Sequence, residues 1–527
     1  MSIRHLFKSV MLIMVFMALT KIFGFVFRIF LSHQLGAEVL GYYQLAFSVF
    51  MVFITLTTSG LTVTLSRFTA EVGGVVPNAP RRVAEDSDPY SRAHTYVSAA
   101  LIVGMFLCVV STVIMLLFKP VFMNIFDNNE LSYQIIITLI PAIFFSCFYS
   151  IFRGYLWGKK NFFAVGITEL FEQAARVLIA VIIIFIFFSS APPEHKAIWS
   201  SISLSIACIM SAVYSAILYW RAGGRLKNPK SAFLPLLKSA GPVTALRLIG
   251  SLSIPLLSFI IPLRLMAVGF TESEAMASLG IVMGMVFPLL LFPSAITSSL
   301  AMALIPDISS NLGDKAKTRE KCVSAISFVL IFSFLLLPLF IAVGEPIGIV
   351  LFNNKEAGQL VAQIAWVMVP MGIAAITSSI LNSLGKEAWG FVNGLISSVF
   401  LLIAIWFLPQ VLGIGALGLG FGVMATVGSV LNLILIDKEL KIKGGESLVN
   451  IKTFLLLTIF TILTGAIGRL TYNLFGGVSA VFIPGLIGGT VSLLCFGVLL
   501  VAFGIIKPKF VVVSFFGVFR KVQKRSY

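Results

Sequence analysis

Residues 99–118 read AALIVGMFLCVVSTVIMLLF and carry no charged side chain. An α-helix needs about 20 apolar residues to cross the roughly 30 Å of hydrocarbon in a bilayer. Only helices and closed barrels satisfy all of their backbone hydrogen bonds in that environment. A barrel strand alternates apolar and polar residues over about ten positions, and this run does not. The stretch therefore predicts a transmembrane helix.

Comparable apolar stretches recur along the whole chain. Of its 527 residues, 58% are hydrophobic and 11% are charged. About fourteen stretches are long enough to span a bilayer, so we predict an all-α polytopic membrane protein. The predicted spans are 6–32, 40–66, 94–118, 132–151, 163–188, 197–220, 239–262, 277–304, 321–344, 360–384, 387–408, 412–436, 451–473 and 480–504.

Lysine and arginine gather in alternate loops, such as 67–93, 221–238 and 438–452, and in the tail after residue 504. Short basic loops stay on the cytoplasmic side of a membrane, so we expect both termini in the cytoplasm. The same topology accounts for the net charge of +17. That charge favours contact with the anionic lipids of the membrane, and its spread over many loops argues against nucleic acid.

The two halves of the chain echo each other. A run from Pro141 to Gly158 is repeated in outline by a run from Pro370 to Gly385. Repeats of six spans begin on the same side of the membrane, and transporters place their substrates between such halves. We predict an N-terminal lobe at 1–230 with spans one to six, a C-terminal lobe at 231–440 with spans seven to twelve, and two extra C-terminal helices with a basic tail at 441–527.

Four basic residues fall inside or at the end of apolar spans. Lys21 and Arg28 are seven residues apart and share a helix face. Counted from Leu6 at 1.5 Å per residue, Lys21 lies about 22 Å along its helix, past mid-membrane. Arg247 lies about one third of the way into the seventh span, and Arg264 marks the outer end of that span.

An ionised side chain at mid-bilayer costs about 3 kcal/mol or more, so it should face a wet cavity or a partner. Arg28 and Arg264 have the alternative of snorkelling to the interface. Lys21 and Arg247 are expected to line a cavity. Their own spans contain no matching acids, and a cavity of this kind suits a polyanion, with phosphate as the first candidate.

The fifth span carries Glu169, Glu172 and Arg176. Glu172 and Arg176 are spaced i, i+4 and can pair on one helix face. Glu169 lies one turn away and joins the same surface. Two interpretations stay open: an internal ion pair that locks this helix to its neighbours, or a coupling-ion or gating site at one of the two glutamates.

The seventh span contains Pro242, Gly250 and Pro255. Proline removes a helix hydrogen bond and clashes with the preceding turn. The helix should therefore bend here, and a bend point is a candidate hinge in a transporter.

No Walker loop, histidine–cysteine metal cluster or catalytic triad spacing is present in the sequence. We therefore predict no cofactor, no metal and no enzymatic activity. A monomer is the simplest expectation.

Several segments resemble a known family. They are KIFGFVFR at 21–28, LGAEVLGYY at 35–43, RGYLWG at 153–158, ELFEQAAR at 169–176, PLRLMAVGF at 262–270 and ALIPDIS at 303–309. Together they resemble the polysaccharide-exporter branch of the multidrug/oligosaccharidyl-lipid/polysaccharide flippase superfamily. Within it the chain looks closest to the stage V sporulation protein B group, which is similar to the lipid II flippases.

The resemblance implies two six-helix lobes around a central cavity, in a bacterial inner membrane. It implies a flippase that moves a polyprenyl-pyrophosphate-linked oligosaccharide, lipid II or a related cell-wall precursor, to the outer leaflet by alternating access. Basic residues on the first helix of lipid II flippases are matched by Lys21 and Arg28, and one on the seventh helix is matched more loosely by Arg247. Apart from Glu387 at the very start of span eleven, spans seven, eleven and twelve contain no acidic residue to serve as a sodium ligand.

Two other functions are alternatives. A multidrug or cation antiporter of the same fold should carry buried acids with aromatic partners, whereas the deep charges of spans one and seven are basic. A membrane partner of a glycosyltransferase, without transport of its own, is the second alternative. The outer loops offer only scattered acids for metal-assisted chemistry.

Overall fold

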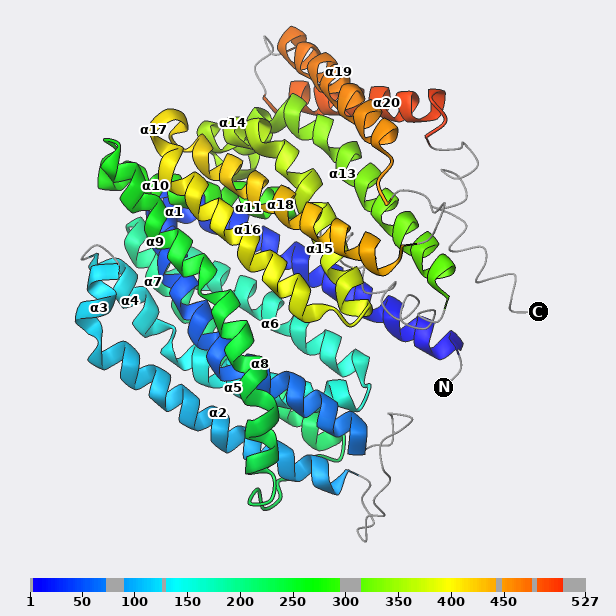
Figure 1. Cartoon of the computed structure of the whole chain (residues 1–527). Helices are drawn as coiled ribbons and strands as arrows, with labels where there is room; N and C mark the ends of the chain where they lie inside the picture. Colours follow the sequence, from blue (N-terminus) through cyan, green and yellow to red (C-terminus); the bar gives the residue numbers. More distant parts are fainter. Residues whose placement is uncertain are drawn as a thin grey trace. The chain divides into compact units, whose positions relative to one another are not determined.

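The computed structural model describes residues 3–72, 90–125, 129–293, 314–441, 448–475 and 481–505. Within these ranges the regular elements are all helices (Figure 1). Thirteen of the described helices or helix runs are long and apolar enough to cross a membrane. The first of them holds two predicted spans, so the fourteen-span prediction and the all-α membrane class are confirmed.

The chain forms two compact units, Met1–Ala295 and Ile296–Tyr527. The predicted lobe boundary at residues 230 and 231 comes from the repeat and falls within the first unit; the repeat itself stays a prediction. The first unit contains α1 (Ile3–Val72), α2 (Ser91–Leu117), α3 (Lys119–Ile125), α4 (Glu130–Thr138), α5 (Ile140–Gly158), α6 (Phe162–Ile182), η1 (Ile183–Phe187), α7 (Pro193–Arg221), α8 (Phe233–Ser251), α9 (Ser253–Ala267), α10 (Glu272–Leu279), η2 (Gly280–Val286) and α11 (Phe287–Leu291).

Helix α1 is two spans joined without a loop. Gly36 adopts φ 70° and ψ 177°, which interrupts the helical geometry. Glycine reaches a positive φ at little cost because it lacks a Cβ. The chain therefore turns at Gly36, between the predicted spans 6–32 and 40–66, and the second half of α1 returns across the unit.

The seventh span is interrupted. Helix α8 contains Pro242 and ends at Ser251, and α9 begins at Ser253. Pro255 lies in the first turn of α9, where a missing N–H leaves no bond unmade. The interruption lies between Gly250 and Pro255, as the pattern predicts; whether it acts as a hinge stays a prediction. The next predicted span, 277–304, is described from Glu272 to Leu291, and its end lies outside the described residues.

The second unit is built around α13, and its core includes a cluster from α13, α15 and α18. Its helices are α13 (Lys315–Phe352), α14 (Lys355–Ile364), η3 (Ala365–Val367), α15 (Met368–Ser383), α16 (Glu387–Phe407), α17 (Pro409–Leu412), α18 (Gly415–Glu439), α19 (Ile451–Phe475) and α20 (Phe482–Ala502). The core cluster consists of Cys322, Ala325, Ile326, Val329, Ile376, Ile380, Leu381, Ile436, Leu440 and Leu448.

The two C-terminal helices pack closely on each other. A Cβ added to Gly468 of α19 would come within 2.8 Å of the carbonyl oxygen of Gly488 on α20. Small residues allow this approach, which drives helix association in lipid by close van der Waals contact. Helices α19 and α20 confirm the two extra spans predicted after the twelfth.

Candidate functional site

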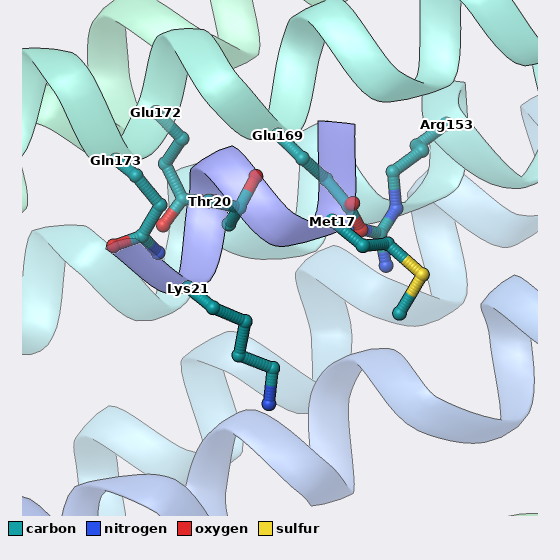
Figure 2. Close-up of a pocket in the computed structure, with 7 residues that line it drawn as sticks. All are labelled: Met17, Thr20, Lys21, Arg153, Glu169, Glu172 and Gln173. Carbon is teal, nitrogen blue, oxygen red and sulfur yellow. The ribbon is translucent and has the colours of Figure 1, made fainter. Parts of the chain in front are cut away.

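A cavity of about 260 Å³ lies among α1, α5 and α6 in the first unit (Figure 2). It is lined by Met17, Thr20, Lys21, Arg153, Glu169, Glu172 and Gln173. Four charged side chains and one amide thus converge within a bundle that is otherwise largely apolar. Because isolated charges are costly at membrane depth, such a convergence is a candidate functional site.

Glycines bring α5 against the second half of α1 next to Arg153. A Cβ on Gly154 would lie 2.9 Å from the carbonyl oxygen of Thr62, and one on Gly158 would lie 2.6 Å from that of Ser66. The four-residue spacing of the two glycines places both on one face, which is the small-xxx-small pattern of close membrane-helix contacts. This contact fixes α5 and thereby positions Arg153 at the cavity.

A third glycine brings α6 against the first half of α1. A Cβ on Gly166 would lie 2.3 Å from the ring of Phe16. Asn161 caps the N-terminus of α6: its side chain accepts a hydrogen bond from the backbone N–H of Ala164, at 3.2 Å. One turn after Gly166, the same helix presents its glutamates to the cavity.

Arg153 and Glu169 form an ion pair between α5 and α6. Nη1 of Arg153 donates to Oε1 of Glu169, and each side chain is 28% exposed. The guanidinium carbon also lies 5.3 Å from the centre of the Tyr149 ring, a cation–π distance. The pair links two helices while part of each charged group remains open to the cavity.

Glu172 and Arg176 form the i, i+4 pair that the sequence predicts. Nη2 of Arg176 donates to Oε1 of Glu172 at 2.8 Å, and the two side chains are 17% and 18% exposed. The buried Nε of Arg176 has no hydrogen-bond partner among the described residues. Glu172 lines the cavity and Arg176 does not. This pair lies within one helix and is more deeply enclosed than the pair of Arg153 and Glu169.

Lys21 supplies the surplus charge of the cavity. It forms no ion pair within the described part of the chain, and Figure 2 shows its side chain extending away from both glutamates. Arg153 and Arg176 are each matched by one carboxylate. The lining alone is balanced, with two cations and two carboxylates; one positive charge is in excess when Arg176, which pairs with Glu172 from outside the lining, is counted with it.

The cavity lies near the end of the bundle where α5 and α6 join. Arg153 is about five residues, or roughly 7.5 Å, from the end of α5 at Gly158. Lys21 shares its cavity and is about 22 Å along the helix from the break at Gly36. The first half of α1 is longer than one bilayer crossing needs, so the depth of Lys21 stays a prediction.

The other predicted cations lie outside this cavity. Arg28 donates from Nη1 to the carbonyl oxygen of Met283, at 3.2 Å. Met283 belongs to the π-helical segment η2, a geometry that often marks functional positions. Arg28 therefore ties the first span to the eighth, in addition to any snorkelling.

Arg247 and Arg264 lie outside the cavity that contains Lys21. Arg247 has an exposed side chain on α8, and Arg264 is half-buried in the last turn of α9. Neither lines the cavity around Lys21. The structure thus gathers Lys21, Glu169 and Glu172 from the predicted set and leaves these two arginines elsewhere.

Sequence reasoning missed Arg153. The predicted fourth span, 132–151, ends before Arg153 and so leaves it in the following loop. Helix α5 instead continues to Gly158 and carries Arg153 inside the bundle. The spacing of Gly154 and Gly158 was the available signal, because a glycine pair of this kind indicates helix packing and not a loop.

Comparison with known proteins supplies relatives at the level of sequence. The family model described as "Polysaccharide biosynthesis protein" matches residues 6–312. Stage V sporulation protein B of Bacillus subtilis (strain 168) is 23% identical over 512 residues, which cover 93% of each chain. Sporulation protein YkvU of the same organism is 23% identical over 312 residues, covering 57% of this chain and 65% of that protein.

Solved structures supply relatives at the level of fold. The lipid II flippase MurJ in an inward closed conformation aligns with a TM-score of 0.65 at 13% identity, covering 92% of this chain and 99% of MurJ. An inward-facing multidrug resistance MATE family transporter of the MOP superfamily aligns with a TM-score of 0.61 at 16% identity, covering 80% and 94%. These alignments show a polytopic membrane fold shared with transporters.

Proposed function

Because the chain belongs to the polysaccharide biosynthesis protein family, we propose that it is a flippase for a polyprenyl-pyrophosphate-linked oligosaccharide. The cargo would be lipid II or a related cell-envelope precursor, made for the cell wall or during sporulation. It would move from the inner to the outer leaflet of the bacterial cell membrane by alternating access. No covalent bond changes in this process.

The observation that carries this proposal is the charge of the cavity. Lys21 and Arg153 line the cavity from two helices, and one positive charge is left over when Arg176, the partner of Glu172, is counted with them. Pyrophosphate is the charged group that lipid-linked sugar precursors share. Arginine binds a phosphoryl group through two parallel hydrogen bonds, and lysine acts as a compact point charge.

Alternating access requires the cargo to bind two states differently. The break at Gly36 and the interruption between α8 and α9 are the candidate points of bending. Both lie in helices that adjoin the cavity or pack on α1. A pyrophosphate that draws Lys21 and Arg153 together would favour one arrangement of these helices over another.

The membrane orientation is proposed from the basic loops and has support from one contact. Nζ of Lys159, after α5, donates to the carbonyl oxygen of Ala222, after α7, at 2.6 Å. Two basic loops therefore lie at the same end of the unit, as the positive-inside rule requires. We place this end, and both termini, in the cytoplasm; labelling of single cysteines at residues 160 and 225 in intact and lysed cells tests the placement.

A cation antiporter is the second candidate, and one observation favours it. Glu169 and Glu172 line the cavity, and an organic cation would need such acids. Each carboxylate is already held by an arginine, so a cation must displace that arginine to bind. Efflux of a cationic dye from cells that express the protein would support this function.

Reconstitution in liposomes tests the flippase proposal. Labelled undecaprenyl-pyrophosphate sugar is placed in both leaflets, and the fraction open to an external enzyme or quencher is followed over time. We expect the protein to speed leaflet exchange and the Lys21→Ala variant to lose most of this effect. Equal exchange in protein-free liposomes would contradict the proposal, and native mass spectrometry of co-purifying lipids would name the cargo.

A further inference from the structure

The ion pair between Arg153 and Glu169 leaves part of the arginine unused. Arg153 contacts both Glu169 and the hydroxyl of Tyr149 through Nη1 alone, the latter at 3.5 Å. A guanidinium has five N–H donors. In the described part of the chain, Nε and Nη2 of Arg153 make no hydrogen bond. Donors therefore remain for a ligand in the cavity.

Glu169 holds Arg153 less firmly than a phosphoryl group would. The carboxylate makes a single contact with Nη1. A phosphoryl oxygen pair engages two N–H groups of the guanidinium fork at once and brings more negative charge. Both members of the pair are partly open to the cavity, so an incoming phosphoryl group has access to the arginine.

We propose that Glu169 is a resident counter-anion that the pyrophosphate of the cargo displaces from Arg153. When the cargo leaves, Glu169 pairs with Arg153 again. This inference deepens the proposed function and rests on it. Arg153 and Lys21 then bind the two phosphoryl groups of one cargo, so a diphosphate binds better than a monophosphate.

The exchange gives Glu169 a role in turnover. In the empty cavity it neutralises Arg153, so that the helices can rearrange without carrying a bare guanidinium through the membrane. In the loaded cavity it competes for the arginine and hastens release. Removing its charge should therefore strengthen binding and slow transport together. If Glu169 only held α5 and α6 together, its neutralisation would not strengthen binding.

The second pair of the same helix provides a matched control. Glu172 also lines the cavity, but its partner Arg176 does not. Neutralising Glu172 removes the same charge from the same cavity without freeing a cation that faces it. Glu169→Gln and Glu172→Gln thus separate the release of Arg153 from a general change in electrostatic potential.

Binding of farnesyl pyrophosphate to the full chain in nanodiscs tests the exchange. We expect Glu169→Gln to raise the affinity about tenfold, which is the size of one charge-assisted hydrogen bond. Glu172→Gln should change it by less than about threefold. In an Arg153→Ala background, Glu169→Gln should add no more than Glu172→Gln does. Farnesyl monophosphate should bind more weakly than the diphosphate to the wild type.

Three results would overturn the inference. One is an affinity that stays equal or falls in Glu169→Gln; another is an equal rise in Glu172→Gln; the third is a rise that persists without Arg153. If Glu169→Gln does not fold, Glu169→Asp, which retracts the carboxylate from Arg153, should show a smaller rise of the same sign.

The experiments distinguish failure of the counter-anion proposal from failure of the flippase proposal. A wild-type protein that exchanges labelled lipid between leaflets, with no gain of affinity in Glu169→Gln, refutes the counter-anion alone. A wild-type protein that neither binds farnesyl pyrophosphate nor exchanges the lipid refutes both proposals.

Discussion

Helices α5 and α6 of the first unit and α15 and α16 of the second occupy matching places in the predicted repeat, yet their polar groups differ in kind. The first pair carries Arg153 and Glu169 at a cavity. The second pair carries amides and hydroxyls: Nδ2 of Asn393 donates to Oδ1 of Asn432 on α18, at 2.9 Å. The contact made by the first pair is thus charged, and the contact made by Asn393 in the second pair is neutral.

Asn432 is paired at both ends of its amide. Besides accepting from Asn393, Asn432 donates to the hydroxyls of Thr377 and Ser378, both at 3.2 Å. Asn393 and Asn432 are 8% and 3% exposed. A buried amide whose donors and acceptor are paired stabilises helix contacts. The partly open ion pair of the first unit can exchange a partner, and this difference separates a binding site from a structural contact.

The largest expected effect is loss of the surplus charge. Lys21→Ala should reduce transport of the labelled lipid by about tenfold to a hundredfold, since a hydrogen bond to a charged group is worth roughly 1.5–3 kcal/mol. Arg247→Ala serves as the control, because Arg247 lies on an exposed face of α8, away from the cavity. A drop of similar size in Arg247→Ala would return that residue to the binding site.

Glycine packing gives the second comparison. Gly154→Ala should destabilise the protein by about 1–3 kcal/mol and lower transport, because its Cβ would lie 2.9 Å from the carbonyl oxygen of Thr62 and α5 must shift. Gly394→Ala on α16 meets no atom within 4 Å and should be neutral or slightly stabilising. Thermal unfolding in detergent and the transport assay measure both variants.

Equal melting temperatures for the two alanine variants would mean that α5 adapts without moving Arg153. In that case the close contact of Gly154 would not be what positions the arginine, and the slower transport should be absent as well.

The amide network provides the third comparison. Asn432→Leu should lower stability by about 1–3 kcal/mol, because it leaves buried partners without hydrogen bonds, while the affinity for farnesyl pyrophosphate stays unchanged. Ser379→Ala on α15 is the control, since its hydroxyl bonds to Ala375 at an exposed position. A change in affinity without a change in melting temperature would assign the second unit a direct part in binding.

Much of the fold follows from hydropathy alone, because a span must be apolar over its whole length. The pair Glu172–Arg176 was also accessible, since i, i+4 spacing is a property of one helix. The pair Arg153–Glu169 was not, because it depends on where α5 ends and on how α5 packs against α6. Which helices pair is set by glycine contacts such as that of Gly154. The positions of charged residues in the sequence do not reveal these contacts.

The depth of Lys21 in the membrane is a further point that the sequence does not fix. Lys21 was placed by counting 1.5 Å per residue from Leu6. Helix α1 runs from Ile3 to the break at Gly36 before its second half begins, which is longer than one bilayer crossing needs. The depth of Lys21 therefore stays a prediction.

The smallest expected effect concerns the electric field across the membrane. Moving one charge across 100 mV is worth about 2.3 kcal/mol. If the excess charge at Lys21 crosses about one third of the field, the work is about 0.8 kcal/mol, or about fourfold in rate. An interior-negative potential assists both the outward passage of an anionic cargo and the return of an empty cavity with one positive charge.

Collapsing the potential with valinomycin and potassium should therefore slow transport by about fourfold at saturating cargo. Lys21→Gln should reduce this dependence on the potential, because its empty cavity is neutral. If transport is indifferent to the potential and stops when a sodium or proton gradient is removed, the excess charge is not what resets the carrier. The amides of the second unit, Asn393 and Asn432, would then become the better candidates for ion coupling, and the proposed contrast between the two units would be wrong.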